Sequence, residues 1–101
     1  MEDNTTKKIA DTVLRISEIC EVSPHDLISR SRQRRLNEVR YIVYSYLHYE
    51  EGLSSFKIGK YFNRDRINII RGIRILKGWT GYHTDIKHKV EDIMKKLKGG
   101  D

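Results

Sequence analysis

Residues 61–72, YFNRDRINIIRG, place polar and basic side chains beside isoleucines at helical spacing. On a helical wheel, Arg64, Asn68, Arg71 and Ile75 share one side, and Ile69, Ile73 and Leu76 lie opposite. Arginine can form two hydrogen bonds with guanine O6 and N7, and asparagine can form two with adenine N6 and N7. The pattern therefore indicates either a helix that contacts base edges or an amphipathic helix with a solvated basic face.

Residues 29–35, SRSRQRR, contain no apolar side chain, and we expect them to form an exposed basic loop. Its serines and arginines could hold phosphates without distinguishing sequence, although a flexible solvated loop is the alternative. The net charge of +6 is concentrated in two segments. Residues 29–40 carry five arginines against Glu38, and residues 57–77 carry seven basic residues against Asp65. Two basic segments in an otherwise acidic chain favour one shared surface for an anionic partner.

Apolar residues recur at helical intervals along most of the chain, and no alternating strand pattern of useful length competes with them. The buried stripe of the first expected helix is Ile9, Val13, Ile16 and Cys20. This helix should end near Val22. Ser23 and Pro24 should then start a short second helix, because serine can cap a helix and proline suits its first turn. A long third helix should cover residues 36–49.

A short fourth helix should cover residues 55–62, and a sharp turn should lead into the fifth. Asn63 can act as the N-cap of the fifth helix, whose apolar stripe reaches towards Gly78. The sixth helix should open around residues 84–85 and close at residues 99–100, which are glycines.

These segments predict an all-α chain of about six helices, with a helix-turn-helix at about residues 54–77. A chain of 101 residues is the size of one domain with a single modest core. We expect this domain to cover residues 7–98, with flexible ends at residues 1–6 and 99–101.

The other chemistry-bearing residues form no recognisable catalytic or metal-binding pattern. Cys20 is the only cysteine, which excludes a disulfide within the chain, and its place on an apolar stripe favours burial. The four histidines are scattered along the sequence. We therefore expect no enzymatic activity, no metal site, no cofactor and no small-molecule substrate. Trp79 lies between two glycines, where it is expected to cover the core from the turn before the sixth helix.

No apolar run approaches the roughly 20 residues that span a bilayer. The first residues, MEDNTTKK, lack the apolar segment of a signal peptide. We expect no membrane span and a cytoplasmic, nucleoid-associated protein.

Four segments, EVSPHDLIS, VRYIVYSYL, IGKYFNRDR and DIKHKV, occur in an order that resembles the C-terminal DNA-binding domain of the bacterial replication initiator DnaA. The resemblance covers roughly residues 7–98. Its most specific element is Ile58, Gly59 and Phe62 followed by Arg64 and Asp65.

The resemblance implies a helix-turn-helix fold that binds double-stranded DNA, with one helix in the major groove and a basic loop on the adjoining backbone. By position, the family's loop arginines correspond to Arg32, Arg34 and Arg35. Arg40 matches a second family arginine on the following helix, and Asp65 matches the acid that opens the recognition helix. Together with the residue chemistry, this gives base contacts expected at Arg64, Asp65, Arg66, Ile67, Asn68 and Arg71. The phosphate contacts are expected at Arg32, Arg34, Arg35, Arg40, Lys57 and Lys60.

The sequence also departs from the family pattern. Asn63 alone replaces a Gly-Gly pair, and residues 66–68 (Arg-Ile-Asn) replace a histidine and two threonines that touch bases. Glu38 stands where the family has an arginine that enters the minor groove, and an acid there would repel phosphates. The chain has no Gly-x-x-x-x-Gly-Lys-Ser/Thr phosphate loop, so the initiator's ATPase is missing.

Two functions remain open from the sequence. The first is a sequence-preferring double-stranded DNA-binding protein that acts in replication or transcription control, with origin binding as the expected role in replication. The second is a protein-interaction module that kept the fold but lost base recognition and binds a protein partner instead.

Overall fold

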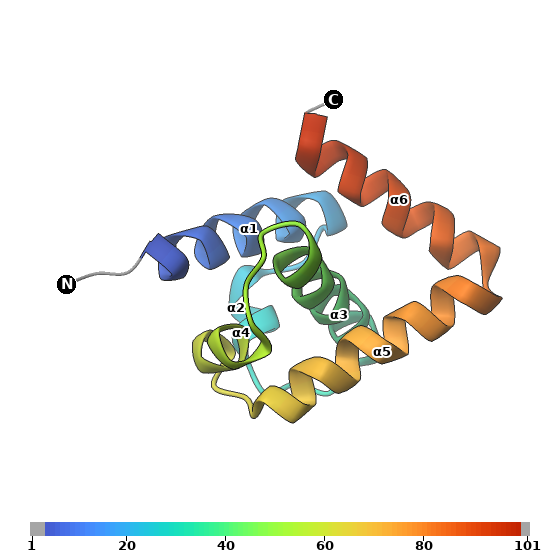
Figure 1. The fold of residues 1–101 in the computed structure, drawn as a ribbon. Coiled ribbons are helices and arrows are strands. Elements are labelled where there is room, and N and C mark those ends of the chain that lie inside the picture. Colours follow the sequence, from blue (N-terminus) through green and yellow to red (C-terminus); the bar gives the residue numbers. More distant parts are fainter. Residues whose placement is uncertain (1–3, 100–101) are drawn as a thin grey trace.

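The computed structural model describes residues 4–99, and this part of the chain forms six α-helices and no strands (Figure 1). The helices are α1 (Asn4–Cys20), α2 (Pro24–Ile28), α3 (Arg34–Tyr49), α4 (Ser55–Phe62), α5 (Arg66–Tyr82) and α6 (Thr84–Gly99). The all-α prediction is therefore confirmed. Residues 4–6 and 99, expected to belong to flexible ends, are helical. The rest of those expected ends, residues 1–3 and 100–101, lies outside the described residues.

Helix α3 forms the centre of the fold. It packs against α1, α2, α4 and α5, and Figure 1 shows it surrounded by them. Its apolar side chains Val43 and Leu47 are completely buried, as the sequence stripe predicts. Helix α6 packs on α5 and α1, and ion pairs join it to both ends of α3, Lys89 to Glu38 and Lys98 to Glu50.

The connection from α1 to α2 is a tight turn. Helix α1 ends at Cys20 rather than near Val22, because Glu21 adopts a left-handed conformation with φ of 57°. The predicted start of α2 is confirmed: the Ser23 hydroxyl accepts a hydrogen bond from the His25 amide at 3.2 Å, and Pro24 is the first helical residue.

The turn between α4 and α5 contains three residues, and its capping differs from the prediction. Asn63 is not an N-cap but ends α4 in the left-handed conformation, with φ of 56°. Asp65 is the N-cap of α5, and its carboxylate accepts a hydrogen bond from the Ile67 amide at 3.0 Å. A Cβ on Gly59 would lie 2.5 Å from the Arg64 carbonyl oxygen, so this turn needs glycine at that position of α4.

Helix α5 is longer than predicted. It continues through Gly78 and Gly81 and ends at Tyr82, and the turn into α6 is at His83. A glycine inside a helix costs only about 1 kcal/mol, which packing can offset. Trp79 lies within α5 rather than in a turn, but it does pack on the core, with its ring 5.7 Å from that of Tyr41.

Candidate nucleic-acid interface

Three separate segments of the chain meet around one open hollow of about 560 Å³. The first segment is the loop of residues 29–33, the second is α3, which forms the floor, and the third is the α4–α5 turn with the N-terminal half of α5. Five arginines line it: Arg30, Arg32, Arg40, Arg64 and Arg71. We call this surface the arginine groove. None of the described residues that line it is acidic, so it is a concentrated positive surface.

The first turns of α5 lie at one edge of the arginine groove. Arg66, Asn68 and Arg71 are exposed there, as expected for residues that approach bases. Ile67 is 56% exposed, so an apolar side chain also points into solvent at this end of the helix. The exposed face thus offers hydrogen-bond donors, an amide and a methyl-bearing side chain, which is the chemistry that distinguishes base pairs in a major groove.

Arg64 lies in the turn before α5 rather than in its first turn. Its guanidinium Nη2 donates a hydrogen bond to the Ser29 carbonyl at 2.9 Å, and Nη1 donates to the Phe62 carbonyl at 3.3 Å. Arg64 therefore joins the basic loop to the α4–α5 turn while it lines the groove. Its neighbour Asp65, expected to contact bases, uses its carboxylate to cap α5.

Arg40, which is expected to contact a phosphate, is buried. This side chain is only 4% exposed, and its guanidinium donates hydrogen bonds to backbone carbonyls of α2 and of the loop between α2 and α3. Burial is the main cause that lowers the pKa of Arg40 below its ordinary value. The positive charge of Arg40 lies beneath the groove, and the N–H groups of its guanidinium donate to acceptors within the protein.

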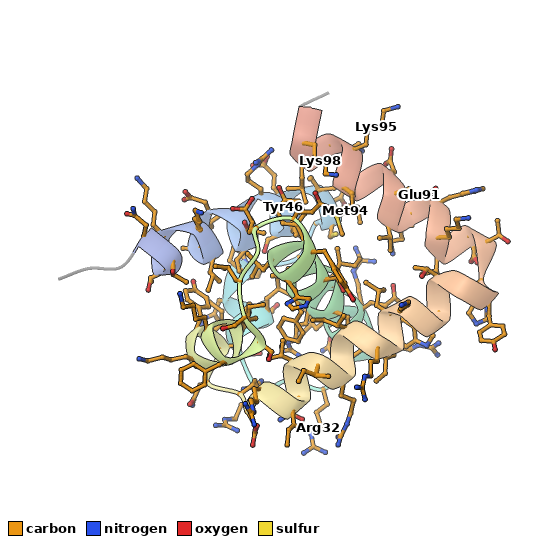
Figure 2. The ribbon with its side chains drawn as sticks, in the orientation of Figure 1. Arg32, Tyr46, Glu91, Met94, Lys95 and Lys98 are labelled. Atoms are coloured by element: carbon orange, nitrogen blue, oxygen red, sulfur yellow. The ribbon has the colours of Figure 1, made fainter. Side chains whose placement is uncertain are left out.

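The remaining expected phosphate contacts lie in three places. Arg32 is exposed and lines the groove, and Figure 2 shows it at the end of the molecule where α5 begins. Arg34 and Arg35 begin α3 and lie outside the groove lining, and Arg35 Nη2 donates to the Cys20 carbonyl at 2.6 Å. Lys57 and Lys60 are exposed on α4.

Lys60 belongs to a second, shallower hollow on the other side of the α4–α5 turn, which it lines together with Phe56 and Arg66. Phe56 is 64% exposed. Asp65 lines this second hollow as well, and Lys57 lines neither hollow, so the α4 lysines lie outside the lining of the arginine groove.

Several residues of this surface are not among the contacts named one by one from the sequence, although Arg30 belongs to the predicted basic loop. Arg30 lines the groove, and Arg74 is exposed one turn beyond Arg71. The groove floor includes the aromatic residues Tyr41 and Tyr44 of α3. The i,i+3 spacing of Arg71 and Arg74 indicates that they share one face of α5. The sequence does not indicate that the two tyrosines lie in the groove floor, because this depends on how α5 crosses α3.

Glu38 does not line the arginine groove. Its carboxylate forms an ion pair with the Lys89 ammonium of α6, with 3.4 Å between Oε1 and Nζ. The acid that was expected to repel phosphates is therefore turned towards α6.

No protein-family model matches this chain, and no curated protein has a matching sequence. Within residues 4–99, no helix is long and apolar enough to cross a membrane. The same part of the chain contains no group of three histidine, cysteine, aspartate or glutamate residues arranged to hold a metal ion.

Proposed function

We propose that this protein binds double-stranded DNA through the arginine groove and the first turns of α5, with a preference for sequence. The observation that carries the proposal is the convergence of arginines from three separate segments on one hollow lined by no acid. Phosphate contacts dominate the affinity of proteins for DNA, and a concave surface of one charge concentrates that interaction.

In this proposal, α5 enters the major groove with its N-terminal end. A helix with its side chains is about 10–12 Å across, and the major groove is about 12 Å wide. Arg66, Asn68 and Arg71 would donate to base edges, and Ile67 would contact a thymine methyl group. The N-terminal end of a helix carries partial positive charge, which favours this orientation on a polyanion.

The basic loop would hold the adjoining backbone. Arg30 and Arg32 would contact phosphates and fix the register of the protein on the duplex without distinguishing sequence. Lys57 and Lys60 would contact phosphates on the other side of the α4–α5 turn, and this pair of helices would act as a helix-turn-helix.

We further propose that the chain is a relative of the DNA-binding domain of the replication initiator DnaA, and that it acts in replication or transcription control. Support comes from residues 58–65, which carry the family's most specific element. The three-residue turn that joins α4 to α5 is compatible with it, because Gly59, Arg64 and Asp65 all have structural roles there.

A random library of duplexes tests sequence preference directly. Selection by the wild-type protein should enrich a motif. The double variant Asn68→Ala/Arg71→Ala should retain much of its affinity and lose the enrichment, because these side chains are assigned to base edges. Lys95→Ala is the matched control, since Lys95 is exposed on α6 at the far end of the molecule from Arg32 (Figure 2).

The second candidate function is a protein-interaction module, and one observation favours it. Two large apolar side chains, Phe56 and Ile67, are 64% and 56% exposed on either side of the α4–α5 turn. Exposed apolar groups rimmed by polar ones occur at protein interfaces. Retarded migration of duplexes without any enriched motif would favour this candidate over sequence-preferring DNA binding.

A further inference from the structure

Every N–H group of the Arg40 guanidinium has an acceptor. Nε donates to Leu27 O at 2.8 Å, Nη1 to Ser31 O at 2.6 Å and Asn37 Oδ1 at 2.8 Å, and Nη2 to Asp26 O and Ser29 O, both at 2.9 Å. A guanidinium has five N–H donors, so none remains for a ligand.

These acceptors are four backbone carbonyls and one side-chain amide, and none is a carboxylate. A buried cation is costly unless its hydrogen bonds are satisfied. The carbonyls of residues 26–31 supply that satisfaction, which means that the loop must keep its path around the guanidinium. The hydrogen bonds that stabilise the buried Arg40 guanidinium therefore also fix the path of the loop.

A second arginine holds the loop from the opposite side. Arg64, in the α4–α5 turn, donates from Nη2 to the Ser29 carbonyl at 2.9 Å, the oxygen that also accepts from Arg40. The loop is thus tied both to α3 and to the turn that leads into α5.

The exposed side chains of the loop alternate with these tied residues. Ser29 and Ser31 are half-buried, whereas Arg30 and Arg32 are exposed. The serine hydroxyls also accept hydrogen bonds from the backbone, since Ser31 N donates to Ser29 Oγ at 3.2 Å. The carbonyls of Ser29 and Ser31 are held by Arg40, and the exposed side chains of Arg30 and Arg32 line the groove on either side of Ser31.

We infer that Arg40 is a positioning residue for DNA binding: its five-donor fork, aided by Arg64 at the Ser29 carbonyl, fixes the loop so that Arg30 and Arg32 face the duplex. The inference rests on the proposed function and adds to it a residue that acts without touching DNA. It also distinguishes arginines that contact phosphate from an arginine that positions the loop, which the spacing of arginines in the sequence does not do.

The variant Arg40→Lys tests this inference because it keeps the charge and removes the fork. Lysine has three donors on one atom and cannot reproduce five bonds in a plane. If about six phosphates are contacted, wild-type affinity falls about a thousandfold between 50 and 200 mM salt. In Arg40→Lys, that loss should shrink to about a hundredfold, as expected when about two contacts, those of Arg30 and Arg32, are no longer made. A folded Arg40→Lys protein with wild-type affinity and salt dependence would overturn the inference.

A double-mutant cycle separates positioning from direct contact. In the Arg30→Ala/Arg32→Ala background, Arg40→Lys should cause little further loss of affinity, because the side chains that it positions are already absent. If Arg40 touched a phosphate itself, its substitution would weaken binding by the same factor in both backgrounds. Equal factors would therefore overturn the inference.

Amide hydrogen exchange of the free protein tests the loop without DNA. Exchange of the Ser31 amide should be faster in Arg40→Lys, while that of Val43, in the middle of α3, should not change. If Arg40→Lys does not fold, Asn37→Ala replaces it, since it removes one acceptor of Arg40, on a half-buried residue, and leaves every charge in place. Faster Ser31 exchange supports the inference, and unchanged exchange in the folded variant overturns it. A wild-type protein that fails to bind duplex DNA would contradict the proposed function, whereas the exchange result would still decide whether Arg40 fixes the loop.

Discussion

The ring of Tyr41 packs directly against the backbone of Gly72. A Cβ on Gly72 would lie 2.6 Å from Cδ1 of Tyr41, so only glycine lets α5 approach α3 this closely. On its other sides, the Tyr41 ring lies 5.7 Å from the Trp79 ring and 6.3 Å from the Tyr44 ring, measured between centroids. This contact sets how α5 crosses α3, and it therefore sets where Arg71 lies relative to the groove floor.

Gly72→Ala should destabilise the protein by about 1–3 kcal/mol, because the added methyl group must displace the Tyr41 ring from its packing against Trp79 and Tyr44. Gly78→Ala is the matched control in the same helix. A Cβ there meets nothing within 4 Å, so this substitution should stabilise the protein by up to about 1 kcal/mol. Urea unfolding of both variants measures the difference, and equal free energies of unfolding would contradict the close contact of Tyr41 with Gly72.

Asp65→Ala should cost about 1 kcal/mol of stability, because it removes the N-cap of α5. Asp65→Asn should cost much less, since the amide oxygen can still accept from the Ile67 amide. The same Asp65→Asn substitution should raise DNA affinity by removing a negative charge beside the groove. Equal stability of the alanine and asparagine variants, measured by urea unfolding, would show that the cap contributes nothing.

The stability of the protein should fall at alkaline pH partly through Tyr44. Burial raises the pKa of its phenol above the ordinary value of 10.0, although Arg64 and Arg40 oppose this shift. The unfolded chain therefore loses the Tyr44 proton more readily than the folded chain. The resulting stability is fully present below pH of about 10 and is lost as the pH rises above it.

Urea unfolding of wild type and Tyr44→Phe at pH 8 and pH 11 measures this effect. The free energy of unfolding should drop less in Tyr44→Phe between the two pH values, because phenylalanine has no proton to lose. An equal drop in both proteins would mean that Tyr44 does not contribute to the alkaline loss.

Helical periodicity predicted six helices, because each helix buries one apolar face and each segment is long enough for the spacing of its apolar residues to be recognised. The exposed face of α5 at residues 66–71 was predicted for the same reason. The burial of Arg40 was not, since arginine is taken as a surface residue by type. Its position did carry a signal: Leu36, Arg40, Val43 and Leu47 follow helical spacing along one stripe.

The α4–α5 turn could not be decided from local sequence. Asn63 and Asp65 are both residues that cap helices, and the choice between them depends on how closely the turn returns to α4. The close approach of the turn to α4 requires glycine at position 59, because a Cβ there would lie 2.5 Å from the Arg64 carbonyl oxygen. The far end of α5 depends similarly on tertiary packing, because Trp79 on Tyr41 keeps the helix continuous past Gly78.

Binding of duplex DNA at 50 and 200 mM salt tests the central claim most directly, with two variants that each remove two positive charges. Arg32→Ala/Arg71→Ala removes groove arginines, and Lys87→Ala/Lys95→Ala removes exposed lysines of α6. Wild-type affinity should fall about a thousandfold between the two salt concentrations, if about six phosphates are contacted. The groove variant should bind more weakly with a smaller salt dependence, and the α6 variant should behave as wild type. Affinity that hardly changes with salt, or an equal loss in the two variants, would contradict DNA binding at the arginine groove.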